Sequence, residues 1–345
     1  MASIRPVILS GGAGTRLWPF STSESPKQFA SLVPGGSLFL QTLTRLESLP
    51  DLGAPIIVTG AAHIELVDAE TTRAGSSPFL CLVEPAPRNT APAVIAAALV
   101  SAADDVLVIL PSDHLIRDKE RFAEAVQESV PLAATGRIVT FGIIPTRAET
   151  GYGYIEVGDS VSNGAFTVKR FKEKPDQEEA DLLTSTGNHV WNSGMFVTTA
   201  GTLLDEARRH CPRILEGVTS ALTEPIGVRV ELGDEFRDVN AISFDHAIME
   251  MTKEAVVMPI DVGWDDVGSF EALWSVSDKD DYGNVTSGET VLIDVGNSFV
   301  KATSRTVAVA GLDDVVVVET PDAVLVVPRG KSQLVKDLLE RVESD

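Results

Sequence analysis

The sequence is poor in cysteine and basic residues, and it has no long apolar run. Its two cysteines, Cys81 and Cys211, cannot build a disulfide framework, and they predict inert thiols in a reducing compartment. No segment approaches the roughly 20 apolar residues of a membrane span. Met1 leads into the first apolar run without the features of a signal peptide. We therefore expect a cytoplasmic protein that does not bind membranes.

The shortage of basic residues also bears on the partners. Against 50 acidic residues there are 28 lysines and arginines, which gives a formal net charge of −22. This balance argues against nucleic acid as a partner. Anionic substrates would have to rely on a few local cations and on metal, although the acidic surplus equally fits a solvated surface. With 345 residues, 44% of them hydrophobic, the chain is long enough for one large domain and a smaller one.

A glycine-rich loop near the N-terminus is the most informative stretch. The apolar run Val7–Leu9 predicts a buried strand, and it leads directly into Ser10-Gly11-Gly12-Ala13-Gly14-Thr15. Glycines allow such a loop to turn tightly and to present backbone N–H groups. Arg16 follows at once, and Lys27 lies eleven residues further on. A strand end, a loop of small residues and two cations indicate a polyphosphate site.

Two familiar phosphate loops are excluded. A P-loop would need Gly-Lys-Ser/Thr, whereas Gly14 is followed by Thr15 and Arg16. A dinucleotide fingerprint would need a third glycine at the position of Leu17, whose side chain is too large for close packing of helix on strand. The glycines alone would also fit an ordinary turn between strand and helix.

Apolar runs alternate with helical patterns along the next hundred residues, which favours parallel strands joined by crossover helices. The run over 79–83 ends in Glu84, and Thr90 is expected to cap the helix that follows. Ligands bind beyond the carboxyl ends of such strands. At that edge the carboxylate of Glu84 could accept hydrogen bonds from two neighbouring N–H donors of a base.

Acidic residues suggest a metal site. Asp113 follows the strand expected over 105–110, although it could equally cap the next segment. Asp261, Asp265 and Asp266 crowd a second loop, where unpaired carboxylates repel one another unless a cation lies among them. Mg²⁺ prefers such oxygen ligands and the phosphates of a substrate.

Three further segments offer groups that could contact a ligand. Gly153 lies in a Gly-Tyr-Gly-Tyr run that allows close approach of a ligand to the backbone. Glu173 and Lys174 offer an acceptor for hydroxyls and a charge for phosphate, and the amide of Asn192 offers both a donor and an acceptor.

The segment 242–250 predicts an amphipathic helix. Beyond residue 281, short apolar runs separated by turn residues predict an all-β tail, and 332–342 predicts a closing helix.

Taken in order, GGAGTRLWP, PKQF, EPAPRNTAP, PSDH, FKEKP and WNSGMF resemble the motifs of sugar-1-phosphate nucleotidyltransferases, in particular mannose-1-phosphate guanylyltransferases. The resemblance implies an α/β fold with a Rossmann-like, mixed and mostly parallel sheet flanked by helices, of the GT-A-like kind. It also implies a small left-handed β-helix-like domain at the C-terminus. The expected division is a catalytic domain over 1–282 and the small domain over 283–345, without the isomerase domain that some relatives carry.

The resemblance further implies the reaction of GTP with α-D-mannose 1-phosphate to GDP-mannose and diphosphate, by a homodimer that uses Mg²⁺. Arg16 would hold the leaving phosphates and Lys27 the α-phosphate. On the family pattern Trp-x-Asp-x-Gly, Asp266 pairs with Asp113 as a metal ligand, with Asp261 or Asp265 as competitors. The nucleotide would contact Ser10, Gly11, Gly12, Gly14, Thr15, Glu84, Arg88, Asn89 and Thr90. The sugar phosphate would contact Gly153, Glu173, Lys174 and Asn192.

Three alternatives remain open. The first is the same chemistry with another sugar or base, because the glycine loop and Glu-Lys-Pro recur in uridylyl- and thymidylyltransferases. The second is a non-catalytic subunit that senses GDP-mannose and regulates a partner; such a chain is expected to lack the loop cations or acids, whereas this one has them all. The third is a metal-dependent glycosyltransferase, whose Asp-x-Asp motif Pro111-Ser112-Asp113-His114 does not supply.

Overall fold

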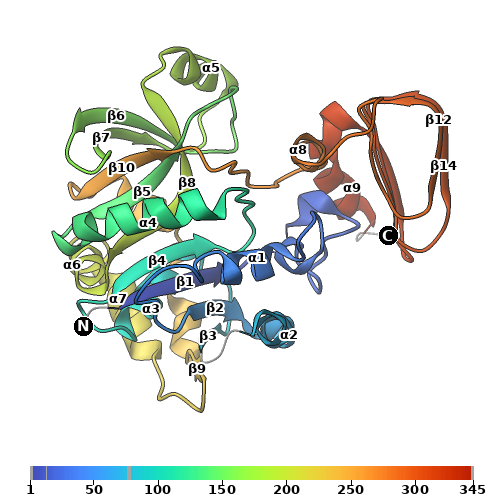
Figure 1. Ribbon diagram of the computed structural model, residues 1–345. Coiled ribbons are helices and arrows are strands. Elements are labelled where there is room, and N and C mark those ends of the chain that lie inside the picture. The colour runs from blue at the N-terminus through green and yellow to red at the C-terminus, as the bar shows by residue number, and fades with distance from the viewer. Residues whose placement is uncertain (1–2, 13, 76–78, 343–345) are drawn as a thin grey trace. The chain divides into compact units, whose positions relative to one another are not determined.

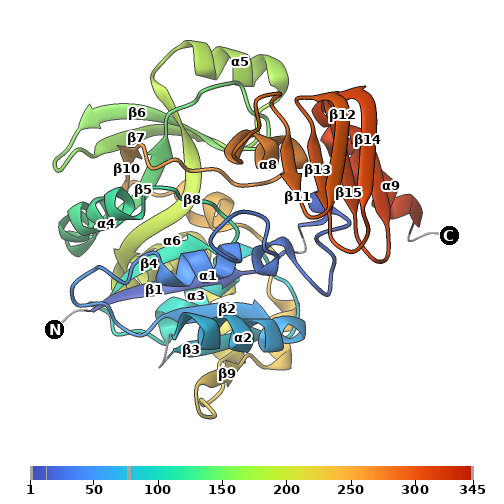
Figure 2. The ribbon, with the colours of Figure 1, turned by 45° about the vertical axis from the view of Figure 1, so that its right-hand side comes forward.

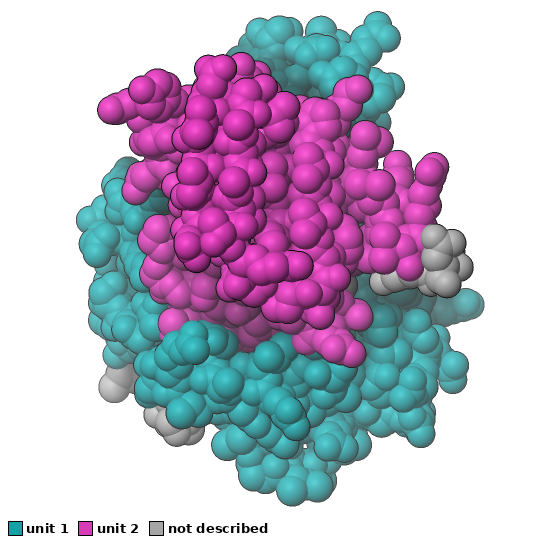
Figure 3. Space-filling model, turned by 90° about the vertical axis from the view of Figure 1, so that its right-hand side faces the viewer, with its two compact units in different colours: residues 1–11, 42–112, 116–264 teal, residues 12–41, 113–115, 265–345 magenta. Residues whose placement is uncertain are grey.

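The computed structural model describes residues 3–12, 14–75 and 79–342. The chain forms two compact units, which Figure 3 colours separately. Unit 1 comprises residues 1–11, 42–112 and 116–264, and unit 2 comprises residues 12–41, 113–115 and 265–345. The chain passes from one unit to the other inside the glycine loop and inside both acidic loops that the sequence singles out. The domain boundary predicted after residue 282 stays a prediction.

Unit 1 is built on one mixed sheet. In the described part of the chain its strands are β1 (Ile4–Ser10), β2 (Ile56–Gly60), β3 (Leu80–Glu84), β4 (Val106–Pro111), β5 (Ile138–Ile143), β6 (Tyr154–Ser160), β7 (Phe166–Lys172), β8 (His189–Thr199), β9 (Arg229–Glu231) and β10 (Ala255–Ile260). Their order is β5-β10-β7-β6-β8-β4-β1-β2-β3-β9. The neighbouring strands β4, β1, β2, β3 and β9 pair in parallel, and Figure 2 shows them in this order. Strand β8 joins them antiparallel to β4.

Helices cover both faces of this sheet. They are α2 (Ile64–Ala74), α3 (Thr90–Leu99), α4 (Lys119–Ala134), α5 (Gln177–Ser185), α6 (Ala200–His210) and α7 (Pro212–Ala221), whereas α1 (Leu38–Thr44) crosses from unit 2 into unit 1. Alternate residues of β4 enter opposite cores: Leu107 packs with α3, α6 and α7, and Val108 packs with α4. Burial on both faces explains why β4 reads as a continuous apolar run.

Unit 2 contains the all-β tail that the sequence predicts. Its elements in the tail are α8 (Phe270–Val276), β11 (Val285–Ser287), β12 (Thr290–Gly296), β13 (Phe299–Ala302), β14 (Val307–Asp313), β15 (Val315–Glu319), β16 (Val324–Pro328), a 3-10 segment (Arg329–Leu334) and α9 (Val335–Val342). Strands β11, β13, β15 and β16 form one sheet and β12 with β14 another. Valines of both sheets, such as Val300 and Val309, pack against each other, so the strands stack in two layers (Figure 1).

The start of helix α3 differs from the expectation. Thr90 is not the N-cap, because Asn89 takes that position and its side-chain oxygen accepts a hydrogen bond from Thr90 N at 2.8 Å. Asn89 adopts a φ of 64°, which asparagine tolerates better than threonine. Thr90 Oγ1 instead accepts from Phe244 N at 2.8 Å. Pro92 lies in the first turn of the helix, where the backbone N–H that proline lacks would have no partner within the helix.

The segment 242–250 also differs from the regular amphipathic helix that was expected. Its helical part is a π-helix over Asp245–Met249, in which Glu250 N donates to Asp245 O at 2.9 Å. Such single turns often occur at functional sites. The apolar side chains of the segment are nevertheless buried, so the predicted burial is right although the hydrogen-bond spacing is not.

Gly142 on β5 provides a test of this packing. A Cβ there would overlap Val190 Cγ2 on β8 and would lie 2.8 Å from Val257 Cγ2 on β10. We expect Gly142→Ala to lower the free energy of unfolding by about 1–3 kcal/mol, since a packed sheet cannot move aside for a methyl group. Gly330→Ala, at a position with no neighbouring atom within 4 Å, is the control. Equal urea midpoints for the two variants would contradict the packing described here.

Candidate active site

The residues predicted from the sequence are divided between the two units. Unit 1 holds Ser10, Gly11, Glu84, Arg88, Asn89, Thr90, Gly153, Glu173, Lys174 and Asn192. Unit 2 holds Gly12, Gly14, Thr15, Arg16, Lys27, Asp113 and Asp266. Ala13 of the glycine loop lies outside the described residues. The geometry of each group is therefore given within its own unit.

Lys27 is the centre of the group in unit 2. The residue is 7% exposed at the start of a 3-10 turn (Lys27–Phe29). Its ammonium lies 2.9 Å from Asp113 Oδ2 and donates to the main-chain oxygen of Asp266 at 2.7 Å. Gly14 allows this arrangement, since a Cβ at Gly14 would lie 2.8 Å from Lys27 Cβ. The structure thus brings together Lys27 and the two predicted metal ligands.

The electrostatics of Asp113 follow from this contact. Burial by itself raises the pKa of Asp113, but the charges of Lys27 and His114 and the hydrogen bond from Lys27 outweigh burial. The pKa of Asp113 therefore lies below its usual range, and the carboxylate is ionised at neutral pH.

The loop that carries Asp266 is tightly held. Asp265 exchanges backbone hydrogen bonds with Leu115 at 2.9 and 3.1 Å, and its Oδ1 accepts from Val267 N at 2.7 Å. Asp266 Oδ1 accepts from Gly268 N at 3.1 Å. Val267 has a φ of 48°, an unfavourable conformation for a β-branched residue. Strain of this kind persists only where the surroundings enforce it, which is common at functional loops.

The donor set of unit 2 suits a divalent cation. Carboxylates are hard oxygen donors, and a positive charge already lies between Asp113 and the Asp266 loop. Within the described residues there is no group of three or more acidic, histidine or cysteine side chains positioned to hold a metal ion. Two aspartates and the phosphates of a substrate match the usual mode of Mg²⁺ binding, which relies on few protein ligands. Asp261, the predicted competitor, is exposed in unit 1.

Arg16 follows the glycine loop in a 3-10 turn (Thr15–Leu17) and is exposed. The turn is anchored by Leu17, which is fully buried in the core of unit 2. Across the described residues the structure records no carboxylate partner for its guanidinium. Arg16 therefore remains available to a ligand within unit 2.

Unit 1 carries three buried polar atoms at the carboxyl ends of its parallel strands. Ser10 ends β1, Ser112 follows β4, and Glu84 ends β3. Ser10 Oγ, Ser112 Oγ and Glu84 Oε1 have no hydrogen-bond partner among the residues described. Buried polar atoms normally are hydrogen-bonded, so a ligand at this edge would complete the set. Sequence reasoning missed Ser112, although its place directly after an apolar strand was a signal.

Glu84 is poised between two protonation states. Burial raises the pKa of its carboxyl group to about 7. A ligand that donates hydrogen bonds would stabilise the ionised form of this buried carboxyl group, which burial alone disfavours.

Three residues in the loop after Glu84 that are predicted to contact the nucleotide form hydrogen bonds within the protein. Arg88 Nε donates to Phe236 O at 3.4 Å, Asn89 caps α3, and Thr90 binds the segment before the π-helix. The predicted nucleotide contacts of these three side chains stay predictions. Their observed contacts fix the loop that follows β3.

The residues predicted for the sugar phosphate form a second group in unit 1. Asn192 on β8 donates its backbone N–H to Gly153 O at 2.8 Å. A Cβ at Gly153 would lie 2.6 Å from Glu173 Oε2, so a larger residue would displace this carboxylate from its present position. Lys174 Nζ lies 3.2 Å from Glu173 Oε1, and Lys174 is exposed with a φ of 43°. The structure therefore gathers the four predicted residues.

Sequence reasoning missed one member of this group. Asp245, the first residue of the π-helix, accepts a hydrogen bond from Asn192 Nδ2 at 2.8 Å. Burial and the nearby charge of Glu173 raise the pKa of Asp245 to about 6. The contact spans 53 residues of sequence, and no motif pointed to it.

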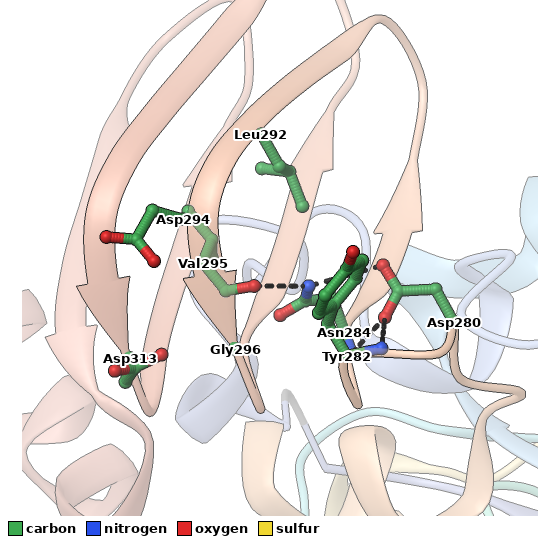
Figure 4. A pocket seen from close by; sticks show the side chains of 8 residues that line it. All are labelled: Asp280, Tyr282, Asn284, Leu292, Asp294, Val295, Gly296 and Asp313. Carbon is green, nitrogen blue, oxygen red and sulfur yellow. Dashed lines mark hydrogen bonds between the residues drawn. The ribbon is translucent and has the colours of Figure 1, made fainter.

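A separate hollow lies in the β-strands of unit 2 (Figure 4). Its volume is about 570 Å³, and it is lined by Asp280, Tyr282, Asn284, Leu292, Asp294, Val295, Gly296 and Asp313. Asp280 Oδ1 accepts hydrogen bonds from the backbone of Tyr282 and Asn284. The hollow contains no predicted site residue, and its acidic walls are unsuited to phosphate.

The carboxyl edge of this α/β sheet, where ligands of such folds bind, carries unpartnered polar atoms in the described part of unit 1. The family model "Nucleotidyl transferase" matches residues 5–282, and "MannoseP isomerase/GMP-like beta-helix domain" matches residues 288–342. The chain therefore belongs to the nucleotidyl transferase family, whose members generally use a divalent metal. The second match confirms the β-helix-like domain expected at the C-terminus.

Individual relatives extend this assignment over the whole chain. Mannose-1-phosphate guanylyltransferase of Escherichia coli K12 is 38% identical over 100% of this chain and 74% of its own length. Xanthan biosynthesis protein XanB of Xanthomonas campestris pv. campestris is 43% identical over 100% of this chain and 74% of its own. The crystal structure of mannose-1-phosphate geranyltransferase from Thermus thermophilus has a TM-score of 0.88, 33% identity and coverage of 99% of this chain and 100% of its own. None of the helices in the described residues is long and apolar enough to cross a membrane.

The ion pair between Lys27 and Asp113 can be tested by a double-mutant cycle. We expect Lys27→Met and Asp113→Asn to show a coupling of about 1–3 kcal/mol in the free energy of unfolding, measured with a chelator present. The reason is that each single variant leaves the other group without its partner in a partly buried place. The exposed pair Arg121 and Glu124 on α4 is the control, with an expected coupling below about 1 kcal/mol. Similar coupling in both pairs would contradict a special role for the buried one.

Proposed function

We propose that this chain catalyses the reaction of GTP with α-D-mannose 1-phosphate to give GDP-mannose and diphosphate. The observation that carries the proposal is the grouping of Lys27, Asp113 and Asp266 in a member of the nucleotidyl transferase family. An oxygen of the sugar phosphate attacks the α-phosphorus of GTP in line, a new P–O bond forms, and the bond to the β-phosphate oxygen breaks. The nucleophile is already ionised, so catalysis consists of positioning and charge neutralisation.

The cations of unit 2 would handle the phosphates. In this proposal Arg16, which is exposed beside the glycine loop, holds the β- and γ-phosphates that leave as diphosphate. Lys27 interacts with the reacting α-phosphate, and backbone N–H groups around Gly12 and Gly14 cradle the chain of phosphates. In a protein of net charge −22, these local cations oppose the repulsion of a polyanionic substrate.

Asp113 and Asp266 would hold Mg²⁺. When bound, the ion neutralises phosphate charge and orients the two substrates. Support comes from the depressed pKa of Asp113, which keeps a hard oxygen donor ionised, and from the ammonium that lies between this carboxylate and the Asp266 loop. The choice of Mg²⁺ over another divalent ion rests on ligand chemistry alone.

In unit 1, Glu84 would recognise guanine by accepting hydrogen bonds from N1–H and N2–H₂. Its unpartnered Oε1 supports this role, as do the unpartnered hydroxyls of Ser10 and Ser112 at the same edge. Adenine would present a mismatched edge to the carboxylate. Arg88, Asn89 and Thr90 would support the nucleotide through the loop that they fix.

The group around Asn192 would bind the sugar. Glu173 accepts from hydroxyls, Gly153 permits close approach, and Lys174 meets the sugar phosphate as a mobile charge. A cytoplasmic location fits the two cysteines, both free and buried. The homodimer stays a prediction. The same chemistry with another sugar or base, and a regulatory subunit without turnover, are the alternatives to be tested.

The decisive experiment combines a substrate panel with two variants. GTP, ATP, UTP and dTTP are each paired with mannose, glucose and fucose 1-phosphates, and diphosphate release is measured. We expect the pair of GTP and mannose 1-phosphate to be preferred, and Arg16→Ala and Asp266→Asn to lower turnover about 10²–10³-fold without lowering the melting temperature. Asp205→Asn, at an exposed position on α6, is the control. Turnover that survives both variants would remove their roles, and no turnover with any pair would favour the regulatory alternative.

Glu84 makes a prediction about pH. Because only the ionised carboxylate can accept from both guanine donors, we expect the Kd of GTP to fall as pH rises from 6 to 8, by up to about tenfold around the pKa of about 7. Glu84→Gln should weaken GTP about 10–100-fold and lose this dependence on pH. Since the raised pKa means that ionised Glu84 costs stability as pH rises through 7, the variant should melt no lower than wild type at pH 8. Parallel pH profiles measured by calorimetry would contradict base recognition by Glu84.

A further inference from the structure

Asn192 has almost all of its hydrogen-bonding capacity occupied by the protein. Its Oδ1 accepts from Gly194 N at 3.2 Å and from Thr140 Oγ1 at 3.0 Å, and the one hydrogen of that hydroxyl is shared with Met195 O at 3.3 Å. Its Nδ2 donates to Asp245 Oδ1 at 2.8 Å. A side-chain amide has two acceptor positions and two donor hydrogens. Both acceptor positions and one hydrogen are thus used, and a single N–H remains for a ligand.

The orientation of the Asn192 amide decides which hydrogen-bonding group the side chain offers to a ligand. An amide whose oxygen and nitrogen can exchange places offers a ligand either a donor or an acceptor. The contacts with Gly194 and Asp245 fix the orientation, because a flipped amide would turn N–H groups toward Gly194 N–H and an oxygen toward the carboxylate. Asn192 therefore presents only a donor, whereas Glu173 presents only an acceptor when ionised.

We propose that Asp245 is a positioning residue, which sets the orientation of the Asn192 amide so that the site offers an N–H donor to a sugar oxygen. This inference rests on the proposed function, because it assigns a role within the sugar-binding group. A hydroxyl that accepts from Asn192 and donates to Glu173 satisfies both side chains. An oxygen without a hydrogen, or a carbon without oxygen, cannot do so. Asp245 thereby contributes to selection of the sugar without touching it.

The charges around Asp245 agree with this role. Burial and the negative charge of Glu173 raise its pKa, whereas the hydrogen bond from Asn192 and the charge of His246 lower it. Lys174, which pairs with Glu173, is the further charged group on that side. A carboxylate in this position holds the amide by a charge-assisted hydrogen bond when it is ionised, and by a weaker one when it is protonated.

The test is a swap of the two side chains. In Asn192→Asp/Asp245→Asn, residue 192 still accepts from Gly194 and Thr140, and residue 245 donates to it, so every hydrogen bond of the pair has a partner. Residue 192 then lacks any N–H for the sugar. We expect this double variant to melt near wild type but to raise the KM for mannose 1-phosphate at least tenfold, with the KM for GTP little changed.

Single variants complete the design. Asp245→Ala removes the anchor and should raise the KM for mannose 1-phosphate about tenfold. Asp245→Asn keeps an acceptor for Asn192, and at pH 8 it should raise that KM less than Asp245→Ala does. Since the raised pKa of Asp245 means that its ionised form costs stability above pH 6, Asp245→Asn should melt no lower than wild type at pH 8. This measurement separates weak sugar binding from a failure to fold.

The dependence on pH supplies a readout that a merely structural role would not change. As pH falls through about 6, protonation of Asp245 should raise the KM for mannose 1-phosphate in the wild type more than in Asp245→Asn. The sugar phosphate itself titrates near pH 6, but it does so equally with both proteins and cancels in the ratio of their KM values. Asp205→Asn again serves as the exposed control.

The outcomes are distinguishable. A double variant whose KM returns to that of wild type would overturn the inference, because it would show that any hydrogen-bonded pair suffices. An unchanged KM in Asp245→Ala, or parallel pH profiles, would overturn it as well while leaving the proposed function intact. A wild type that releases no diphosphate with any sugar 1-phosphate would overturn the proposed function, and this inference with it.

Discussion

The ammonium of Lys27, held between the carboxylate of Asp113 and the main-chain oxygen of Asp266, is the contact on which the group proposed to bind phosphate depends. It joins three segments that are far apart in sequence: the glycine-loop region, the end of β4 and the loop after β10. The chain is strongly acidic, so a cluster that concentrates positive charge is needed wherever anions bind. A divalent ion on Asp113 would compete with Lys27 for the same oxygen. Binding of a metal ion to Asp113 would therefore free the Lys27 ammonium to interact with a phosphate.

The acids in the candidate site differ in their protonation. The charges of Lys27 and His114 lower the pKa of Asp113, whereas burial raises the pKa values of Glu84 and Asp245. A cation ligand matches the first kind, and ligands that donate N–H or O–H groups match the second. The raised values cost stability above pH 6 to 7, which is a common consequence of keeping a binding group ready for its ligand. This difference in protonation agrees with the ligands proposed for the three acids.

Much of this was predictable from the sequence where local patterns carry the information. The strand over residues 79–83 and the short strands of the tail follow from apolar runs and turn residues. The structure brings the side chains of Lys27 and Asp113 together, and the roles expected for them stay predictions. Asp245 was not predictable, because its meaning depends on a hydrogen bond to a residue 53 positions away and on a π-turn that the periodicity of the sequence does not encode. The cap of α3 was assigned to Thr90 instead of Asn89, because both residue types cap helices and only the backbone conformation distinguishes them.

The position of Asn89 as the cap of α3 also explains how the start of this helix contacts the segment before Asp245. Because Asn89 caps α3, the hydroxyl of Thr90 is available to hold Phe244 N, and Ala91 N donates to Ile242 O at 3.1 Å. These contacts fasten the segment that leads directly into Asp245, which in turn orients Asn192. A residue first considered for the nucleotide thus supports the group considered for the sugar, through consecutive hydrogen-bonded steps. The start of helix α3 thus lies in the loop proposed to contact the nucleotide, and it also holds the segment that leads to the group proposed to bind the sugar.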